Sequence, residues 1–310
     1  MESHNIVQFT VSESGERLDK IIIAQLPALS RAQVQALIKD GMVTVDGETS
    51  KPSAKLKGES LIQVTLPVVE DESIIEPESL DLDIRYEDEH IVVLNKPSGL
   101  VVHPGVGNVQ GTLVNALLAR YPEMIDMQDD PQAEGRMGIV HRLDKDTSGL
   151  MVVARHVEAL YQLMGQFQAR TVEKYYTALL ERRPKTNTGT IDAPIARDPR
   201  QRKRMAVVRD GKPAVTEFEL IDDNFLDGRA LVCLRLHTGR THQIRVHMAF
   251  IGCPVVGDIV YGYRKQRTGL KRQFLHASEL AFDHPATGER LHFTSELPVG
   301  LQNILDKLRS

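Results

Sequence analysis

The stretch His141 to Gly149 reads HRLDKDTSG and separates two apolar segments, GIV at 138–140 and LMVVA at 150–154. Three basic side chains stand around Asp144 and Asp146 in it. An aspartate beside Thr, Ser and Gly is most often a turn residue that binds its own backbone. However, catalytic groups commonly lie on loops held by a rigid sheet, and neighbouring positive charge favours an ionised carboxylate. We therefore treat this loop as a candidate site centred on Asp144, with a plain turn as the alternative.

A second motif-rich stretch, LHTGRTHQIRVHMAFIGCPVVGDIVYG, covers residues 236–262. His237, His242 and His247 raise the possibility of a metal site. Their spacing is not the i, i+4 pair of a helical zinc site, and no cysteine or carboxylate completes a set. We expect 241–248 to be a strand, which would place His242 and His247 on opposite faces. The pattern argues against zinc.

A third stretch, residues 94–117, reads LNKPSGLVVHPGVGNVQGTLVNAL and resembles a dinucleotide-binding turn. Its glycines, Gly105, Gly107 and Gly111, are spaced one residue too far apart for the usual fingerprint, and Pro97 and Pro104 interrupt the approach. A nucleotide-dependent enzyme that uses this loop stays open as one alternative.

The chain is strand-rich from about residue 84. Helices are predicted only over 111–120 and 156–170. Strands are predicted at HIVVLNKP (90–97), GIVH (138–141), LMVVAR (150–155), EKYYTALL (173–180), AVTEFELI (214–221), ALVCLRLHT (230–238) and THQIRVHM (241–248). Since most strands follow one another without a helix between them, the sequence predicts an α+β domain on a mixed, largely antiparallel sheet with flanking helices.

The N-terminal region has a different pattern. Leu18, Ile21, Ile22 and Leu26 have helical spacing, and Ser30 is placed to cap a second helix that ends near Gly41. Two short strands follow, MVTVDGE at 42–48 and LIQVTL at 61–66. A small helix–helix–hairpin domain is predicted.

The net charge of −4 is unevenly distributed. Residues 70–89 hold ten acids and one base, whereas residues 197–212 hold seven bases and two acids, and residues 264–272 hold five bases and no acid. Local basic runs matter more for RNA contact than total charge, although each run could also be a solvated loop. The acidic residues 69–83 are predicted to be a linker.

The remaining composition narrows the class of protein. Cys233 and Cys253 are the only cysteines, too few for a disulfide framework, which fits a reducing cytoplasm. No apolar run reaches the length of a membrane span, and the N-terminus lacks a secretory pattern. A cytoplasmic protein with one large and one small domain is expected.

Taken together, HRLDKDTSG, NKPSGLVVHPG (95–105), Lys174-x-Tyr176 and TGRTHQIRVHM (238–248) resemble the motifs of the RluA-type RNA pseudouridine synthases, in the order of that family. Residues 15–68 resemble the S4 RNA-binding domain. The resemblance implies an S4-like domain over 1–68, an acidic linker over 69–83, and a catalytic domain over 84–310. That domain would have the pseudouridine synthase fold with a central active-site cleft.

The resemblance also implies roles for individual residues. Asp144 would be the essential aspartate, and Arg245 would pair with it. Tyr176 would stack on the flipped uracil and is a candidate base for a later proton transfer, while Arg142 would fill the gap left in the RNA stack. The expected RNA-binding residues, drawn from the motifs, the S4-like domain and the basic run 197–212, are Arg142, His141, Arg240, His242, Arg31, Lys39, Arg202, Lys203 and Arg204.

The implied activity is the isomerisation of specific uridines in structured RNA, most closely those of helix 69 in 23S rRNA. The expected partner is 23S rRNA or the pre-50S particle, without a membrane, cofactor or metal, and the protein is expected to be a monomer. Two alternatives stay open besides the nucleotide-dependent enzyme. One is a synthase of the same branch that acts on other 23S rRNA or tRNA uridines, and the other is a non-catalytic S4-type ribosome-assembly factor.

Overall fold

The computed structural model of the 310-residue chain describes residues 4–12, 15–27, 29, 31–56, 58–67, 75–105, 108–128, 130, 133, 135–201, 204–263 and 268–309. The chain forms two compact units, Met1–Ile74 and Ile75–Ser310. The second unit begins inside the predicted linker. Glu78 donates its backbone N–H to the Asn115 carbonyl at 3.0 Å, and the Asn115 amide donates to the Glu76 carbonyl at 2.7 Å. Residues 75–83 therefore belong structurally to the larger unit.

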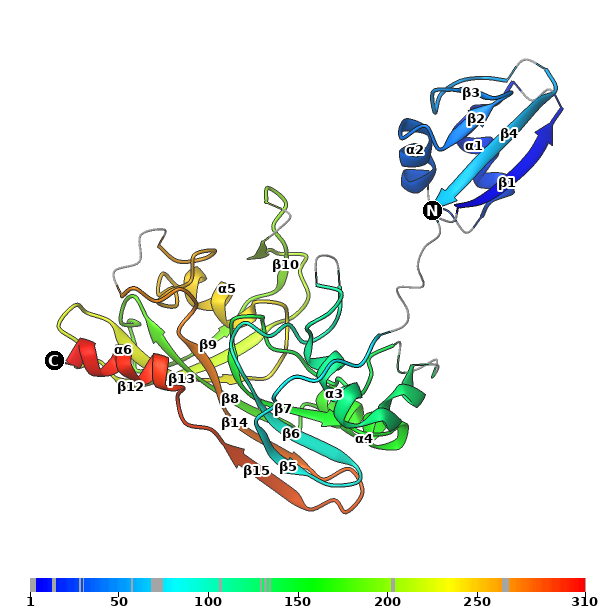
Figure 1. Ribbon diagram of the computed structural model, residues 1–310. Coiled ribbons are helices and arrows are strands. Elements are labelled where there is room, and N and C mark those ends of the chain that lie inside the picture. The colour runs from blue at the N-terminus through cyan, green and yellow to red at the C-terminus, as the bar shows by residue number, and fades with distance from the viewer. Residues whose placement is uncertain are drawn as a thin grey trace. The chain divides into compact units, whose positions relative to one another are not determined.

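The first unit packs two helices against a four-stranded antiparallel sheet of order β1-β4-β2-β3 (Figure 1). Its elements are β1 (His4–Val11), α1 (Leu18–Gln25), α2 (Arg31–Lys39), β2 (Val43–Val45), β3 (Glu48–Thr49) and β4 (Ser60–Pro67). The predicted helices and hairpin are present, and β1 was not predicted. Leu18 and Ile22 of α1 are buried with Ile62 and Val64 of β4 in a core of the unit's own. The predicted N-cap, Ser30, lies outside the described residues.

The second unit contains a nine-stranded sheet of order β5-β6-β7-β14-β8-β13-β12-β9, with β15 paired to β14 beside this path. The strands are β5 (Ile84–Glu87), β6 (Ile91–Lys96), β7 (Ser148–Ala154), β8 (Glu173–Leu180), β9 (Thr188–Asp192), β12 (Val215–Asp222), β13 (Ala230–Leu236), β14 (Leu275–Asp283) and β15 (Arg290–Thr294). Among these described strands, only β7 and β14 pair in parallel. The prediction of a mixed, largely antiparallel sheet is confirmed.

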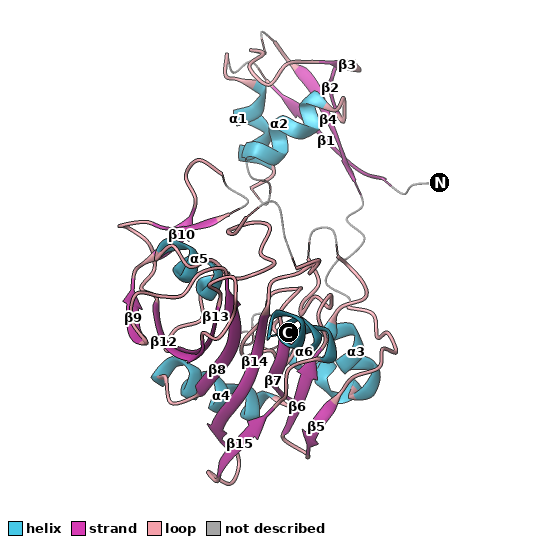
Figure 2. Cartoon of the chain, turned by 90° about the vertical axis from the view of Figure 1, so that its left-hand side faces the viewer, coloured by secondary structure: helices cyan, strands magenta, loops and turns pink. Residues whose placement is uncertain are grey.

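Helices flank this sheet on both faces. They are α3 (Leu113–Arg120), η1 (Pro122–Met127), α4 (Val157–Ala169), α5 (Gln243–Phe250) and α6 (Val299–Arg309), and a separate two-stranded sheet joins β10 (Ile195–Arg197) to β11 (Met205–Val207). Figures 1 and 2 show α3 and α4 on one face and α6 on the other. Leu160 and Leu163 of α4 and Leu301 and Leu305 of α6 are buried in one core with the central strands. None of the helices in the described ranges is long and apolar enough to cross a membrane.

The prediction of a strand over 241–248 is wrong, because residues 243–248 belong to helix α5 and residues 241 and 242 form the turn before it. Ile244, Val246 and Met248 alternate with polar residues, which is the pattern of a strand. However, every residue from Gln243 to Met248 is buried, so the pattern does not distinguish one face from another. His242 and His247 therefore do not lie on opposite faces of a strand, as had been expected. The predicted strand GIVH is also absent, since Ile139 makes only an isolated bridge to Val153.

Candidate active site

The loop that carries Asp144 is fixed by backbone contacts from two other segments. The buried Lys96 ammonium, at the end of β6, donates to the carbonyls of Pro97 at 2.8 Å, Leu100 at 2.8 Å and Lys145 at 3.1 Å. Burial lowers the pKa of Lys96 to about 8. Gly99 donates its N–H to the same Lys145 carbonyl at 2.8 Å. The NKPSG segment therefore acts as a brace for the Asp144 loop.

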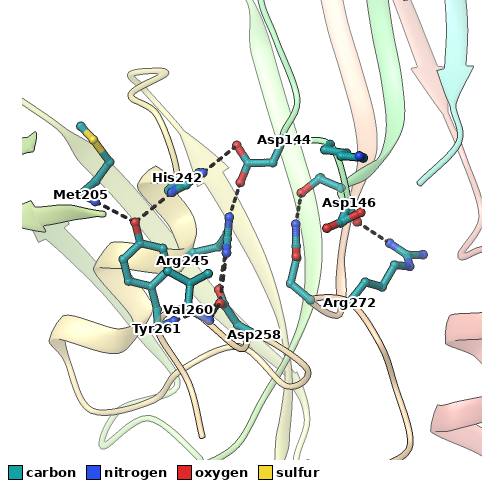
Figure 3. Close-up of polar contacts among 12 residues, drawn as sticks. Asp144, Asp146, Met205, His242, Arg245, Asp258, Val260, Tyr261 and Arg272 are labelled. Atoms are coloured by element: carbon teal, nitrogen blue, oxygen red, sulfur yellow. Dashed lines mark hydrogen bonds and ion pairs between the residues drawn. The ribbon is translucent and has the colours of Figure 1, made fainter. Parts of the chain in front are cut away.

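The far end of the loop is held from β14 and the turn before it. Arg272 donates to the Asp146 carbonyl at 3.0 Å, and the Gln273 amide donates to the Thr147 hydroxyl at 3.1 Å (Figure 3). Thr147 also donates its N–H to the Asp144 carbonyl at 3.0 Å, which closes a turn. The turn geometry expected of this sequence is thus real, and it serves to present the Asp144 side chain.

Asp144 is paired with Arg245 through one of its two carboxylate oxygens. Arg245 donates from one terminal nitrogen to Oδ2 of Asp144 at 2.9 Å, and the predicted pair is present in the structure (Figure 3). Its other nitrogens bind Asp258 at 2.6 and 3.0 Å. Because Asp258 is fully buried and also accepts the N–H groups of Val260 and Tyr261, the guanidinium has one fixed orientation.

The second oxygen of Asp144 faces His242. Nε2 of His242 lies 3.9 Å from Oδ1, too far for a hydrogen bond. Its other nitrogen, Nδ1, lies 2.8 Å from the Tyr261 hydroxyl, which also accepts the Met205 N–H at 2.9 Å. The Tyr261 ring stacks against two guanidiniums, with centroid distances of 5.1 Å to Arg245 and 5.0 Å to Arg204. Oδ1 is therefore the oxygen of Asp144 that is left available for chemistry.

Asp144 opens onto a cleft of about 800 Å³. It is lined by residues 136, 139–144, 147, 167, 168, 170, 174 and 236–245, together with Val102, His103, Tyr176 and Leu275. The residues that sequence reasoning selected from three separate motifs, Asp144, Tyr176 and Arg245, are thereby brought to one place. Such a volume can hold a nucleoside-sized group.

Tyr176 of β8 lies in the wall of this cleft with only 6% of its surface exposed. Burial, followed by the charge of Asp144, raises the pKa of Tyr176 well above its usual range. The hydroxyl therefore stays protonated at neutral pH, and the phenolate that general-base catalysis needs is scarce. This favours the predicted stacking role over the predicted role as a base.

His141 and Lys174 form the neighbouring wall. The His141 ring stacks on Phe167 of α4, with centroids 4.9 Å apart, and Nε2 accepts the Val152 N–H at 3.0 Å. Burial, with a smaller effect from Lys174, lowers the pKa of His141 to about 3. His141 is therefore uncharged at neutral pH. It can contact RNA through the surface of its ring, but not through a positive charge. The mostly buried Lys174 lies 5.1 Å from the Phe167 ring, and burial lowers its pKa to about 8.

The other predicted RNA-binding residues are dispersed. Arg142, Arg240 and His242 line the cleft, and Arg142 is exposed. Arg31 and Lys39 are exposed on α2 of the first unit. Arg204 is half-buried, and its guanidinium lies against the Tyr261 ring. Arg202 and Lys203 lie outside the described residues.

Sequence reasoning assigned no role to Asp258 or Tyr261, although they occupy the segment GDIVYG at 257–262. The only sign of their role in the sequence is that Asp258 is an aspartate inside an otherwise apolar run. A buried carboxylate needs a partner, so its position predicts a buried cation nearby. Nothing in the sequence, however, identifies Arg245 as that cation.

The dinucleotide-binding alternative does not fit the loop before α3. At a phosphate site the N–H groups at a helix start are free to bind the ligand. Here Gly111 donates to the Glu78 carboxylate at 2.7 Å, and Thr112 donates to the Asn115 side chain at 3.0 Å. The next two N–H groups, of residues 113 and 114, donate to backbone carbonyls. Gly107 lies outside the described residues. Among the described residues, no group of three His, Cys, Asp or Glu side chains could hold a metal ion.

Comparison with known proteins gives consistent matches over both units. The RNA pseudouridylate synthase family model matches residues 90–250, and the S4 domain model matches residues 16–62. An uncharacterized RNA pseudouridine synthase of Chloroflexus aurantiacus is 50% identical over 98% of this chain and 93% of its own length. The ribosomal large subunit pseudouridine synthase D of Xanthomonas campestris pv. campestris is 44% identical over 96% of this chain and 90% of its own.

Solved structures agree with these matches. Human RNA Pseudouridylate Synthase Domain Containing 1 has a TM-score of 0.58 and 29% identity, covering 74% of this chain and 90% of that one. Human RNA Pseudouridylate Synthase Domain Containing 4 has a TM-score of 0.56 and 28% identity, covering 73% of this chain and 93% of that one.

Proposed function

The chain belongs to the RNA pseudouridylate synthase family, and we propose that it isomerises uridines of the large ribosomal subunit RNA, with Asp144 acting on the ribose. One observation carries the assignment of the site. Asp144 is held over the cleft by Arg245 through Oδ2, and Oδ1 is left without a hydrogen bond among the described residues. A fixed carboxylate with one free oxygen is what the reaction needs next to the sugar.

Pseudouridine formation breaks the N1–C1′ bond, turns the base, and joins it again through C5. Two routes give Asp144 a role. In the first, Oδ1 attacks C1′ while the N1–C1′ electron pair passes to the uracil, as in retaining glycosidases. In the second, Oδ1 removes the C2′ proton and a glycal forms. Arg245 serves both routes, because its orientation is fixed from behind by Asp258.

The target nucleotide must leave the RNA stack to reach the cleft, at a cost of a few kcal/mol that is smallest in loops and bulges. The Tyr176 ring in the cleft wall provides a surface on which the flipped uracil can stack. Exposed Arg142, on the same loop as Asp144, is placed to occupy the gap that the base leaves.

The substrate assignment is supported by relatives named ribosomal large subunit pseudouridine synthase D, including those of Pseudomonas aeruginosa and Escherichia coli at 43% and 42% identity. We infer 23S rRNA, at the uridines of helix 69, as the target, either free or in the pre-50S particle. We also infer that the protein acts in the cytoplasm and as a monomer.

The test of the site compares two substitutions in one loop. Asp144→Asn should lower pseudouridine formation on a helix 69 RNA by at least about 10³-fold, the scale on which removing a nucleophile or base acts. Binding of the RNA should stay within about threefold, since one neutral-for-charged change in the cleft alters few phosphate contacts. Asp146→Asn is the matched control, because the hydrogen bonds described for Asp146 are accepted by its backbone carbonyl and its side-chain charge acts on Lys96 and Arg272 rather than in the cleft. This variant should keep most of its activity.

Equal activity of the Asp144→Asn variant and the wild type would rule out the assignment of Asp144. A wild-type protein that binds the RNA but forms no pseudouridine would favour the assembly-factor alternative, to which the S4-like unit lends support. Mapping of pseudouridines in 23S rRNA and tRNA from cells without this protein would decide between helix 69 and other uridines.

A further inference from the structure

The contacts of Tyr261 determine which nitrogen of His242 carries a proton. The Tyr261 oxygen accepts the Met205 N–H at 2.9 Å and lies 2.8 Å from Nδ1 of His242. If Nδ1 carried the proton, the hydroxyl would accept twice and its own proton would have no acceptor among the described residues. With Nδ1 as the acceptor, the Met205 N–H, the Tyr261 hydroxyl and Nδ1 are all satisfied, and Nε2–H keeps its proton for a ligand in the cleft.

The environment of Nε2 favours the same tautomer. Nε2 faces Oδ1 of Asp144 at 3.9 Å, where an N–H is attracted to the carboxylate and a lone pair would be repelled (Figure 3). Burial lowers the pKa of His242, and this outweighs the opposing charge of Asp144, while the cations Arg245 and Arg142 add to the lowering. Burial likewise raises the pKa of Tyr261, so its hydroxyl keeps its proton.

These contacts place a neutral N–H donor beside the available oxygen of the reactive carboxylate. We propose that Nε2–H of His242 donates a hydrogen bond to the O2 carbonyl of the target uracil as the N1–C1′ bond breaks, and that Tyr261 is the positioning residue that fixes this tautomer. The proposal rests on the proposed function, and it makes specific the RNA-binding role expected for His242.

The chemistry explains why a donor at this place would help. When the N1–C1′ bond breaks, by attack of Oδ1 on C1′ or by removal of the C2′ proton, its electron pair moves onto the uracil. O2 is the carbonyl next to N1, so it gains negative charge closest to the sugar on which Asp144 acts. A preorganised donor in a cleft that excludes water stabilises such charge more than it stabilises the neutral base. The donor keeps its proton, so no further acid or base is required for this step.

The experiment uses the full-length protein in two arms. In the first, ¹⁵N-histidine labelling identifies the His242 resonances by their loss in His242→Gln, and reports the tautomer without reference to activity. We expect Nδ1 to be unprotonated and Nε2 protonated in the wild type, and this preference to weaken in Tyr261→Phe. A wild-type signal with Nδ1 protonated would overturn the proposal.

In the second arm, single-turnover rates at saturating helix 69 RNA are compared. His242→Ala should lose about 10² to 10³-fold, the range found for one donor to developing charge. His242→Gln keeps a hydrogen-bond donor, its side-chain amide, at the position whose φ is 58°. Its single-turnover rate should be at least tenfold higher than that of His242→Ala. RNA affinity should change little, whereas a purely phosphate-binding His242 would alter affinity and leave the rate at saturation unchanged.

An RNA with 2-thiouridine at the target position completes the second arm, because sulfur is a weaker acceptor than oxygen. The sulfur should slow the wild type relative to the uridine substrate. It should not slow His242→Ala, which already lacks the donor. Equal slowing of both proteins would place the donor elsewhere and overturn the proposal. If the wild type forms no pseudouridine on any RNA, the proposed function is wrong. The tautomer of His242 is measured independently of activity, so that part of the proposal is tested separately.

Discussion

Asp258 shows how much of the site depends on a residue that never reaches the substrate. Burial alone would raise the pKa of Asp258, but the hydrogen bonds and charge of Arg245 outweigh it, so the pKa lies below its ordinary value. A buried pair of this kind contributes little net stability when intact, yet it costs much when broken, because one charge is left without its partner. Arg245 would then face Asp144 with no opposing constraint.

We therefore expect Asp258→Asn to lower the free energy of unfolding by about 3 kcal/mol, the scale for removing one partner of a buried ion pair. Urea unfolding measures the change. The matched control is Asp223→Asn, whose ion pair with Arg183 is about 40% exposed on both sides and should contribute less than about 1 kcal/mol. Equal decreases in the unfolding free energy of the two variants would show that breaking the buried Asp258–Arg245 pair costs no more stability than breaking an exposed pair.

His141 leads to a prediction about pH. Its pKa in the fold is lowered to about 3 from an ordinary 6.5, so between these values the unfolded chain binds a proton that the folded protein does not. Stability must therefore fall as the pH drops from 6.5 towards 3, by at most about 1.4 kcal/mol per pH unit from this group. Above pH 6.5 the effect vanishes.

His141→Gln keeps an acceptor for the Val152 N–H but cannot titrate, so we expect a flatter dependence of unfolding free energy on pH between 6.5 and 4. Parallel urea titrations of the two proteins at four pH values measure this slope. Since folded His141 is uncharged at neutral pH, the variant should also bind RNA with unchanged salt dependence. A shallower dependence of affinity on salt in the variant would instead indicate that His141 binds a phosphate as a cation.

At the scale of elements, the contact between β7 and β14 positions the loop before β7. Gly149 has a φ of +126°, and a Cβ there would lie 2.3 Å from the Ala277 carbonyl oxygen and 2.4 Å from its nitrogen. These are backbone atoms of the only parallel pairing in the described sheet, so they can yield only if the two strands separate. The approach of β14 behind the Asp144 loop thus requires glycine.

Gly149→Ala should accordingly destabilise the larger unit by more than about 3 kcal/mol, the combined cost of overpacking and strained backbone. Gly165→Ala is a control of identical chemistry, because a Cβ at Gly165 in α4 meets nothing within 4 Å. There the change should stabilise by up to about 1 kcal/mol through helix propensity. Thermal unfolding of both variants measures the difference, and equal melting temperatures would contradict the argument.

The sequence predicts elements well where an apolar run is long and bounded by turn residues, and poorly where buried polar residues alternate with the apolar ones. β6, β7, β8, β12 and β13 lie at or near their predicted positions because their apolar runs are long and bounded by turn residues. α5 was predicted as a strand because its polar residues alternate with apolar ones, as they do on a strand with one exposed face. In the structure the polar residues are buried as well. Gln243 bonds Thr238, Arg240, Val215 and Thr216, and His247 bonds Thr216 and Ala193, so their polarity reflects buried partners rather than solvent.

The site can be predicted to the extent that motifs carry it. Asp144, Arg245 and Tyr176 are identifiable from sequence because each lies in a distinctive short pattern. The roles of Asp258 and Tyr261 depend on which residues the fold brings behind Arg245 and His242. Distances of 2.6 Å from Arg245 to Asp258 and 2.8 Å from His242 to Tyr261 span 13 and 19 residues of sequence, and no local periodicity encodes them.

At the scale of the whole molecule, the two units divide the tasks that RNA modification requires. Each has its own buried core, one around Leu18 and Ile62 and the other around the nine-stranded sheet. The Asp144 cleft is built entirely from the second unit. We therefore expect the first unit to contribute through RNA binding, and its exposed cations to affect affinity rather than chemistry.

Arg31 and Lys39 are the residues on which this division can be tested, because both are exposed on α2 and both were expected to bind RNA. The double variant Arg31→Gln with Lys39→Gln removes two cations whose binding to phosphates would release counterions. The plot of log affinity against log salt should become shallower by about 2, or about 1 for each phosphate that is no longer neutralised.

Turnover at saturating RNA should stay within about twofold of the wild type, since transition-state contacts are untouched and only uniform binding is weakened. Glu158→Gln, which alters an exposed charge on α4 of the second unit, is the control and should leave the salt dependence unchanged. A fall in turnover at saturation for the Arg31/Lys39 variant would mean that the first unit helps to assemble the active site. An unchanged salt slope would mean that α2 does not contact the RNA.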